Sequence, residues 1–307
     1  MVDKRIIALG FFDGVHRGHG SLLSRCAQMA AVHHCRSAAL TFADHPDKLV
    51  YGKDPELINT KEDRALLMQR RYGIDEVLMM PFDRTVMEMP WQDFFEMLVG
   101  QYRAAGLVCG HDFCFGARGE GDAEKLTALC RQRGIPCQVI PEQRCDGVVI
   151  SSTYIRELLR QGDVERAARF LGHYHMLSGR VISGRQIGRT LGFPTANLAQ
   201  PQGLVPLRHG VYACRVHLED GFYMAVTNVG TRPTVNGSHV TIEPWILDYN
   251  GDLYGKDIRL SFHAFLRPEE NFGSLERLKA AVLENERQTR AYFQDDGWQK
   301  EEIPDVI

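Results

Sequence analysis

The stretch RIIALGFFDGVHRGHGSLLSRC, residues 5–26, decides the fold of the first half of this chain. It opens with a continuous apolar run, residues 5–10, which is typical of a strand buried on both faces. A glycine-rich loop follows, and apolar residues at helical spacing begin at Leu22. A strand, a glycine-rich loop and a helix in this order predict the first unit of a parallel sheet, with a ligand site beyond the carboxyl end of the strand.

The same alternation continues to residue 141. Short apolar runs alternate with longer amphipathic segments, and two of the helical segments end at Gly73 and Gly134. We expect further strands at residues 37–42, 74–82, 105–110 and 135–141, and helices at 20–34, 60–73, 89–102 and 121–134. Five such repeats predict an α/β fold with a doubly wound parallel sheet.

The pattern changes near residue 172. Two helical segments, residues 152–161 and 163–172, precede a long region in which apolar and polar residues alternate between glycine turns. No helical segment returns until residues 274–293. The second half therefore predicts an antiparallel β-barrel with a terminal helix, and we expect two domains, residues 1–172 and 173–307.

Composition narrows the function classes. The chain has 307 residues and a formal net charge of −3, so the sequence does not indicate a broad basic face that would bind nucleic acid. No apolar stretch approaches the roughly 18 residues of a membrane span, and the N-terminus lacks a signal-peptide pattern. The eight cysteines form no C-x-x-C pair, which predicts reduced thiols in a cytoplasmic protein. A homo-oligomer is possible, and the sequence does not specify the number of subunits.

The loop after the first strand is a candidate phosphate site. Gly10, Gly14 and Gly18 allow close approach of the backbone to a phosphate, and the following helix offers unpaired N–H groups. The imidazoles of His16 and His19 can donate hydrogen bonds to phosphate oxygens and stabilise charge in a transition state. The alternative is a half-built metal site or a loop histidine pair, although no obvious third ligand lies nearby in the sequence.

Two further polar clusters follow strands of the first half. Three hydroxyl residues and Arg156 occur in ISSTYIR, residues 150–156, and could grip a polyphosphate, or serve only as an ordinary helix N-cap. The segment GHDFCFGARGEGD, residues 110–122, contains Asp112 and two phenylalanines. These side chains could bind a ligand that has a planar ring with a polar edge, or the segment could be an ordinary glycine-rich loop.

The second half has its own candidate site in SGRVISGRQIGRTLGFPTANL, residues 178–198. Its glycines allow a backbone to fold over phosphates. Thr195 and Asn197 alternate on an extended segment, so both point to one face and can hold Mg²⁺ together with phosphate oxygens. Glu243, on a later strand, could take a proton from an attacking hydroxyl, or could be an ordinary solvent-facing glutamate.

The order of these motifs resembles the bacterial bifunctional riboflavin kinase/FAD synthetase family. GFFDGVHRGH and ISSTYIR resemble the H-x-G-H nucleotidyltransferases, and GRTLGFPTANL, GDLYGK and LRPEENF complete the likeness over nearly the whole chain. The resemblance implies two reactions. The barrel would phosphorylate riboflavin with ATP and Mg²⁺ to give FMN, and the first half would transfer an adenylyl group from ATP to FMN, giving FAD and pyrophosphate.

The resemblance also implies roles at matching motif positions in the first half. His16, His19 and Arg156 would support the adenylyl transfer. The ATP site would comprise Gly10, Phe11, Phe12, Asp13, His16, His19, Ser151, Ser152 and Arg156. The flavin of this half would contact His45, Asp112 and Phe113.

In the kinase half, the resemblance makes Glu243 the general base that deprotonates the riboflavin hydroxyl. Thr195 and Asn197 would hold Mg²⁺. The full Mg-ATP site would comprise Gly184, Gly188, Gly192, Pro194, Thr195 and Asn197, and the flavin would contact Arg232, Arg267 and Glu270.

One departure from the family pattern bears on the kinase half. Pro244 and Trp245 follow Glu243, and a proline in a strand predicts an edge or a bulge that could displace the glutamate. The alternatives left open are therefore a monofunctional FAD synthetase whose barrel only binds flavin, and a flavin-binding regulator without catalysis. A different H-x-G-H enzyme, such as a cytidylyl or pantetheine-phosphate adenylyltransferase, is disfavoured because those lack a C-terminal barrel with GFPTAN.

Overall fold

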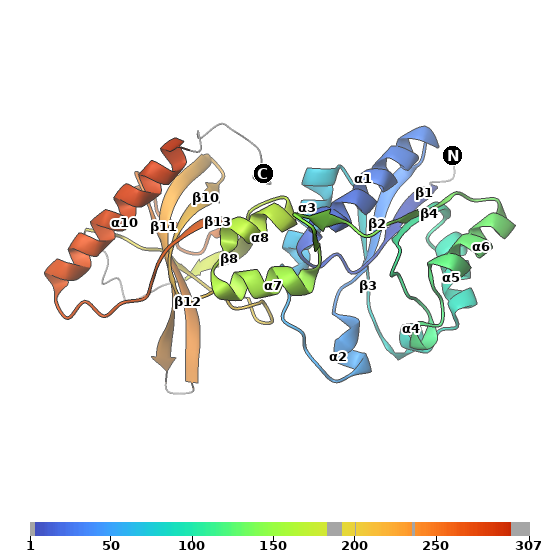
Figure 1. Cartoon of the computed structure of the whole chain (residues 1–307), viewed down its shortest axis with the longest axis horizontal. Coiled ribbons are helices and arrows are strands. Elements are labelled where there is room, and N and C mark those ends of the chain that lie inside the picture. The colour runs from blue at the N-terminus through green and yellow to red at the C-terminus, as the bar shows by residue number, and fades with distance from the viewer. Residues whose placement is uncertain (1–3, 183–191, 200, 235–236, 296–307) are drawn as a thin grey trace. The chain divides into compact units, whose positions relative to one another are not determined.

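A computed structural model describes residues 4–182, 192–199, 201–234 and 237–295, without the side chains of residues 232–239 and 295 (Figure 1). The chain forms two compact units. Among the described residues, the first comprises 4–57 together with 61–152, and the second comprises 58–60 together with the chain from 153 to 295. The domain boundary that the sequence predicts after residue 172 concerns which segments can fold independently, and it stays a prediction.

The first unit alternates strands and helices, as the sequence predicts. Its elements are β1 (Arg5–Leu9), η1 (Asp13–Val15), α1 (Arg17–Val32), β2 (Arg36–Phe42), α2 (Pro46–Val50), α3 (Lys61–Tyr72), β3 (Glu76–Met80), α4 (Arg84–Met87), α5 (Trp91–Gly100), β4 (Ala104–Gly110), η2 (Ala117–Gly119), α6 (Ala123–Arg133), β5 (Cys137–Ile140), β6 (Arg144–Cys145) and β7 (Val148–Val149).

The five long strands of this unit form a parallel sheet in the order β3-β2-β1-β4-β5. The chain runs outward from β1 to β3 and then returns to the other side of β1, which confirms the doubly wound topology. Because the direction of winding reverses there, the carboxyl ends of β1 and β4 border the crevice where such sheets bind ligands.

The side chains of alternating residues in β1 point to opposite faces of the sheet. Ile7 and Leu9 join one hydrophobic cluster with residues of α5 and α6, such as Phe95 and Leu126. On the other face, α1 packs against β1 and β2, and the Cys26 thiol contacts the carbonyl oxygen of Ile6 at 3.2 Å. Burial on both faces explains the continuous apolar strands, and it makes the sheet a rigid base for the loops at its carboxyl edge.

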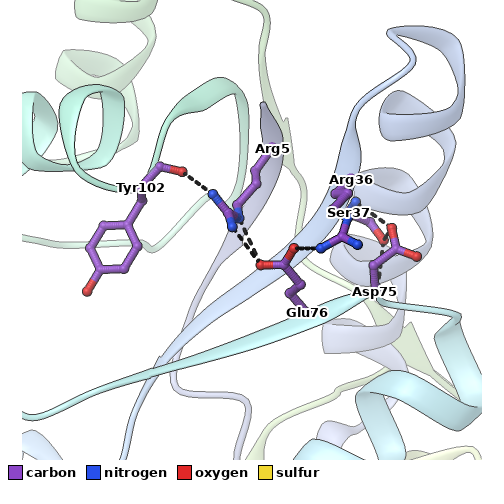
Figure 2. Close-up of polar contacts among 6 residues, drawn as sticks. All are labelled: Arg5, Arg36, Ser37, Asp75, Glu76 and Tyr102. Carbon is purple, nitrogen blue, oxygen red and sulfur yellow. Dashed lines mark hydrogen bonds and ion pairs between the residues drawn. The ribbon is translucent and has the colours of Figure 1, made fainter. Parts of the chain in front are cut away.

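Polar side chains tie the opposite, amino-terminal edge of the sheet together (Figure 2). Glu76 accepts hydrogen bonds from Arg5 Nε at 2.9 Å and from Arg36 Nη1 at 2.6 Å, so its carboxylate joins β1, β2 and β3. Asp75 accepts from the Ser37 hydroxyl at 2.9 Å and from the Ser37 backbone N–H at 2.8 Å. These contacts hold the strand register at the edge away from the ligand crevice.

The second unit is a barrel with helices. Its elements are α7 (Ser152–Gln161), α8 (Val164–Leu171), β8 (His175–Ile182), β9 (Asn197–Leu198), β10 (Gly210–Leu218), β11 (Gly221–Thr234), β12 (Gly237–Ile246), β13 (Asp257–Pro268) and α10 (Leu275–Asp295). The strands close in the order β10-β11-β12-β9-β8-β13. The antiparallel barrel and its terminal helix confirm the expected architecture of this half.

The two faces of the barrel wall differ in what covers them. Tyr212, Cys214, Thr227 and Phe262 are fully buried and fill the inside. The alternate residues face outward, where Ala213 packs with the α10 residue Phe293 and α10 lies along β10 and β11 (Figure 1). Residues such as Asn228 and Glu243 therefore belong to the outer surface of the wall.

The expected edge or bulge at Pro244 is wrong. Pro244 lies inside β12 and pairs with Thr227 of β11 in an unbroken register, and β12 also borders β9. The Pro244 carbonyl accepts a 2.9 Å hydrogen bond from the Ala196 N–H. In an antiparallel ladder, the N–H and the carbonyl of one residue face the same neighbour, so the bond that proline lacks is lost on the short β9 side. The long β11–β12 ladder is unaffected.

Candidate active sites

A cavity of about 1340 Å³ lies at the carboxyl edge of the parallel sheet. Its wall includes the residues after β1, the loop after β4, and the chain that leads into α7. The volume exceeds the roughly 300–1,000 Å³ of an ordinary small-ligand pocket. The first unit therefore has room for two substrates side by side at the point where the winding of the sheet reverses.

The loop between β1 and α1 is strained. Phe12 has φ 61° and Val15 has φ 43°, and a positive φ is rare for a bulky or β-branched residue. Such conformations cost about 1–3 kcal/mol each and persist only where the surroundings hold them. Three bonds to the loop carbonyls do so: Thr41 Oγ1 and Arg64 Nη1 donate to Phe11 O at 2.8 and 3.0 Å, and Ser152 Oγ donates to Asp13 O at 2.9 Å.

The two histidines of this loop form a stacked pair at the start of α1. His16 Nδ1 accepts a hydrogen bond from the His19 backbone N–H at 3.2 Å, so His16 is the N-cap and its Nε2 carries the proton when the ring is neutral. The rings lie 3.6 Å apart. Burial lowers the pKa of His19 well below its usual value, and the charges of His16 and Arg64 lower it further. The His19 ring is therefore neutral near pH 7.

The loop after β4 forms another wall of the cavity. Phe113 and Phe115 stack with 5.5 Å between ring centroids, and Phe115 and Gly121 bridge the two ends of the loop. Gly116 has φ 74°, and a Cβ there would lie 2.5 Å from the Trp91 backbone. An aromatic shelf beside a glycine turn can support a planar ring.

The structure brings most of the expected first-half residues to one place. Those that line the cavity are Gly10, Phe11, His16, His19, Asp112, Phe113, Ser151 and Ser152. Phe12 and Asp13 are buried in the strained loop and are not among the lining residues. His45 caps α2 and contacts the Phe11 ring edge-on at 4.5 Å, and Arg156 belongs to the second unit. Their roles remain predictions.

Two residues of this site were missed by sequence reasoning. Arg64 is almost fully buried and bonds to the carbonyls of Phe11 and Phe42, and Thr41 shares the first of these acceptors. A signal for Arg64 was present, because it precedes Leu67 and Met68 by three and four residues and so lies on the apolar face of its helix. No comparable signal distinguished Thr41.

The candidate kinase residues form a row on the outer face of the barrel. Asn228 of β11 pairs directly with Glu243 of β12. The pairs Leu198–Ile242 and Thr195–Trp245 set the register of the next segment, which places Asn197 opposite Glu243 on its other side. A hydroxyl, two amides and a carboxylate thus share one face, and Pro244 points to the other.

The remaining expected kinase residues lie around this row or outside the described part of the chain. Gly192 and Pro194 precede Thr195, whereas Gly184, Gly188 and the side chain of Arg232 fall outside the described residues. Arg267 donates from Nε to Asn285 Oδ1 of α10 at 3.1 Å. Burial lowers the pKa of Arg267, and the charge of the exposed Glu270 acts in the opposite direction.

Comparison with known families finds one match in each half of the chain. A family model described as FAD synthetase matches residues 2–154, and one described as riboflavin kinase matches residues 171–293. A bifunctional riboflavin kinase/FMN adenylyltransferase of Escherichia coli K12 is 35% identical over 94% of this chain and 92% of its own length. This chain belongs to that bifunctional family. A member from Listeria monocytogenes is 31% identical over 94% of this chain and 93% of its own length.

The fold of the family also occurs among solved structures. A crystal structure described as a macrolide-efflux protein from Streptococcus pneumoniae is 27% identical, with a TM-score of 0.85 over 94% of this chain and 95% of that one.

Among the helices that the structure describes here, none is long and apolar enough to cross a bilayer. Among the described residues, no group of three or more His, Cys, Asp or Glu side chains is arranged to hold a metal ion.

Proposed function

We propose that this chain makes FAD in two steps, phosphorylating riboflavin on the barrel and adenylylating FMN in the cavity of the first unit. Membership of the bifunctional family supports both activities. The observation that carries the second step is the cavity itself, which has room for two nucleotides and is lined by the glycine loop, the histidine pair and the hydroxyls of Ser151 and Ser152.

Adenylyl transfer joins a phosphate oxygen of FMN to the α-phosphorus of ATP and releases pyrophosphate. The protein's task is to align the two and to neutralise charge, with little covalent work. The N-terminus of α1 and the His16 and His19 rings would face the phosphates, and the Phe113–Phe115 shelf would support a ring system. Neutral imidazoles fit this role because each still donates one N–H.

The kinase step transfers the γ-phosphoryl group of ATP to the riboflavin hydroxyl. The oxygen donors of Thr195 and Asn197 fit Mg²⁺, which often takes one or two protein ligands and leaves its other positions to phosphates and water. When bound, Mg²⁺ would neutralise charge on the phosphates. Glu243, opposite Asn197, would take the hydroxyl proton.

The unbroken β12 register weakens the case for an impaired kinase, because Pro244 leaves Glu243 in line with Asn197 and Asn228. All eight cysteines are free thiols, which supports our proposal of a reducing, cytoplasmic setting. A homo-oligomer remains a prediction from sequence.

One assay tests both steps. The purified chain is incubated with riboflavin, ATP and Mg²⁺, and FMN, FAD and pyrophosphate are followed over time. We expect FMN to appear first and FAD with pyrophosphate to follow, and we expect both to stop when Mg²⁺ is chelated. FMN without FAD would reject the adenylyltransferase assignment, and FAD made only from added FMN would reject the kinase.

A further inference from the structure

We propose that Arg64 is a positioning residue for adenylyl transfer: it holds the backbone ends of β1 and β2 together and so sets where Phe11 and His19 stand in the cavity. The inference rests on the proposed function of the first unit. Arg64 does not line the cavity, so it would act through its neighbours and would not touch a substrate.

The contacts of Arg64 connect two active-site loops. Nη1 donates to Phe11 O at 3.0 Å, just beyond β1, and Nη2 donates to Phe42 O at 2.7 Å, at the end of β2. The guanidinium carbon also lies 4.3 Å from the centre of the Phe11 ring. Phe11 and Phe42 both line the cavity. A planar fork can reach both carbonyls at once, whereas the single ammonium of a lysine cannot reproduce this geometry.

A purely structural purpose would be served better by an apolar side chain. Arg64 is 1% exposed on the helix face that carries Leu67 and Met68, and burying a charge there is costly. Burial lowers the pKa of Arg64 to about 10, although the charges of Asp13 and Glu62 act in the opposite direction. The group remains a cation at pH 7, and a leucine or methionine would fill the same face without this penalty.

The cation also acts on the histidine pair. The titratable and charged groups that face His19 are His16, the N-cap of its helix, and Arg64, from α3. Asp13, from the strained loop, and Glu62 face Arg64 itself. A positive charge near His19 disfavours the imidazolium, so removal of that charge will let the ring take up a proton at a higher pH.

The test compares Arg64→Met and Arg64→Lys with wild type, in the full chain, and uses Arg70→Met as the control. Arg70 is exposed on the same helix. Riboflavin phosphorylation by the same molecules reports on the barrel, and thermal unfolding reports on the fold. We measure kcat and KM for ATP in FAD formation from pH 5 to pH 9.

For Arg64→Met we expect kcat for FAD formation to fall about 10²-fold, the loss that a misplaced reacting group produces, with FMN formation unchanged. The acid limb of the pH profile of kcat for FAD formation should move to higher pH in this variant. Arg64→Lys should lower kcat by a similar factor but leave the acid limb in place. If Arg64→Met does not fold, kcat of Arg64→Lys tests the positioning role: a fall supports it, and a wild-type value contradicts it.

Two results would overturn the inference. One is wild-type kcat, KM and pH profile in the variants. The other is a lower melting temperature with an unchanged pH profile and an unchanged kcat per folded molecule, which a merely structural role predicts. Failure of the wild-type chain to make FAD at all would instead refute the proposed function.

Discussion

The imidazole rings of His16 and His19 are stacked, with 3.6 Å between their centroids and 11° between their planes. Two positive charges about 4 Å apart repel by about 4 kcal/mol at the effective dielectric near a protein surface. The pair can therefore carry one positive charge at most under ordinary conditions. Because His16 Nδ1 accepts the helix-capping bond, the neutral His16 ring keeps its Nε2–H available to an anion.

Replacing His19 with alanine should separate the two activities. We expect FAD formation from FMN to fall about 10²–10³-fold, the usual loss for one donor to a charged transition state. FMN formation from riboflavin should continue at the wild-type rate, because His19 lies in the first unit. Chromatography of both products checks this. Parental FAD synthesis in the variant would remove the histidine loop from the mechanism.

Replacing Glu243 with glutamine should have the reverse effect. The amide keeps the shape but cannot accept the riboflavin proton, so kinase turnover should fall about 10²–10⁴-fold while FAD formation from added FMN persists. Asp248→Asn is the matched control, since Asp248 follows β12 and pairs with Arg290 of α10. Equal kinase turnover in wild type and Glu243→Gln would exclude this glutamate as the base.

The second unit should lose stability in mild acid. Burial lowers the pKa of His175 to about 3 and of His217 to about 4, and it lowers the pKa of His263 well below the usual value. The unfolded chain binds protons at these groups near pH 6.5, whereas the folded chain does not. The free energy of unfolding should therefore be highest above about pH 6.5 and fall by up to about 1.4 kcal/mol per histidine for each pH unit below it.

Calorimetry of wild type and His217→Gln from pH 7.5 to pH 4.5 measures this slope. Glutamine keeps a polar group near the Ser261 hydroxyl, which lies 3.2 Å from His217 Nε2, but it does not titrate. The variant should show a shallower decline than wild type. A melting temperature of wild type that stays constant across this range would contradict the assignment of neutral buried histidines.

Glu76→Gln should weaken the first unit alone. Burial raises the pKa of Glu76, but hydrogen bonds from Arg36 and Arg5 outweigh it and leave the pKa lowered (Figure 2). The charged form therefore stabilises the fold above about pH 4.5, and this contribution is lost as pH falls through the lowered value. At pH 7 the variant should lose about 1–3 kcal/mol of unfolding free energy. Chemical denaturation monitored by loss of adenylyl transfer checks this, and riboflavin phosphorylation should be lost at the same denaturant concentration as in wild type.

Local pattern was sufficient to predict the architecture. Continuous apolar strands such as Ile6–Leu9 indicate a sheet covered on both sides, and alternation in the second half indicates a wall with two different faces. The clustering of Gly10, His16 and Ser151 in one cavity also followed from the rule that carboxyl ends of parallel strands meet at one edge. These inferences need only chain order and residue type.

Hydrogen bonds between residues that lie far apart in the sequence could not be predicted from the local sequence pattern. The role of Ser152 in the ATP site stays a prediction, but nothing in the sequence indicated that its hydroxyl donates to the carbonyl of Asp13, 139 residues away. The bond between Arg64 and Phe11 spans 53 residues. The interpretation of Pro244 failed because a sequence shows that an N–H is absent but not which neighbouring strand would have received it.

The size of the chamber in the first unit matters for the design of inhibitors. A compound that mimics only one reactant would leave the rest of this space filled with water, and it would compete with a single partner. Two flat aromatic heads tethered through a short dianionic bridge would engage both ends, so that the second contact forms within a single molecule. Such a tethered compound should dissociate far more slowly than either fragment.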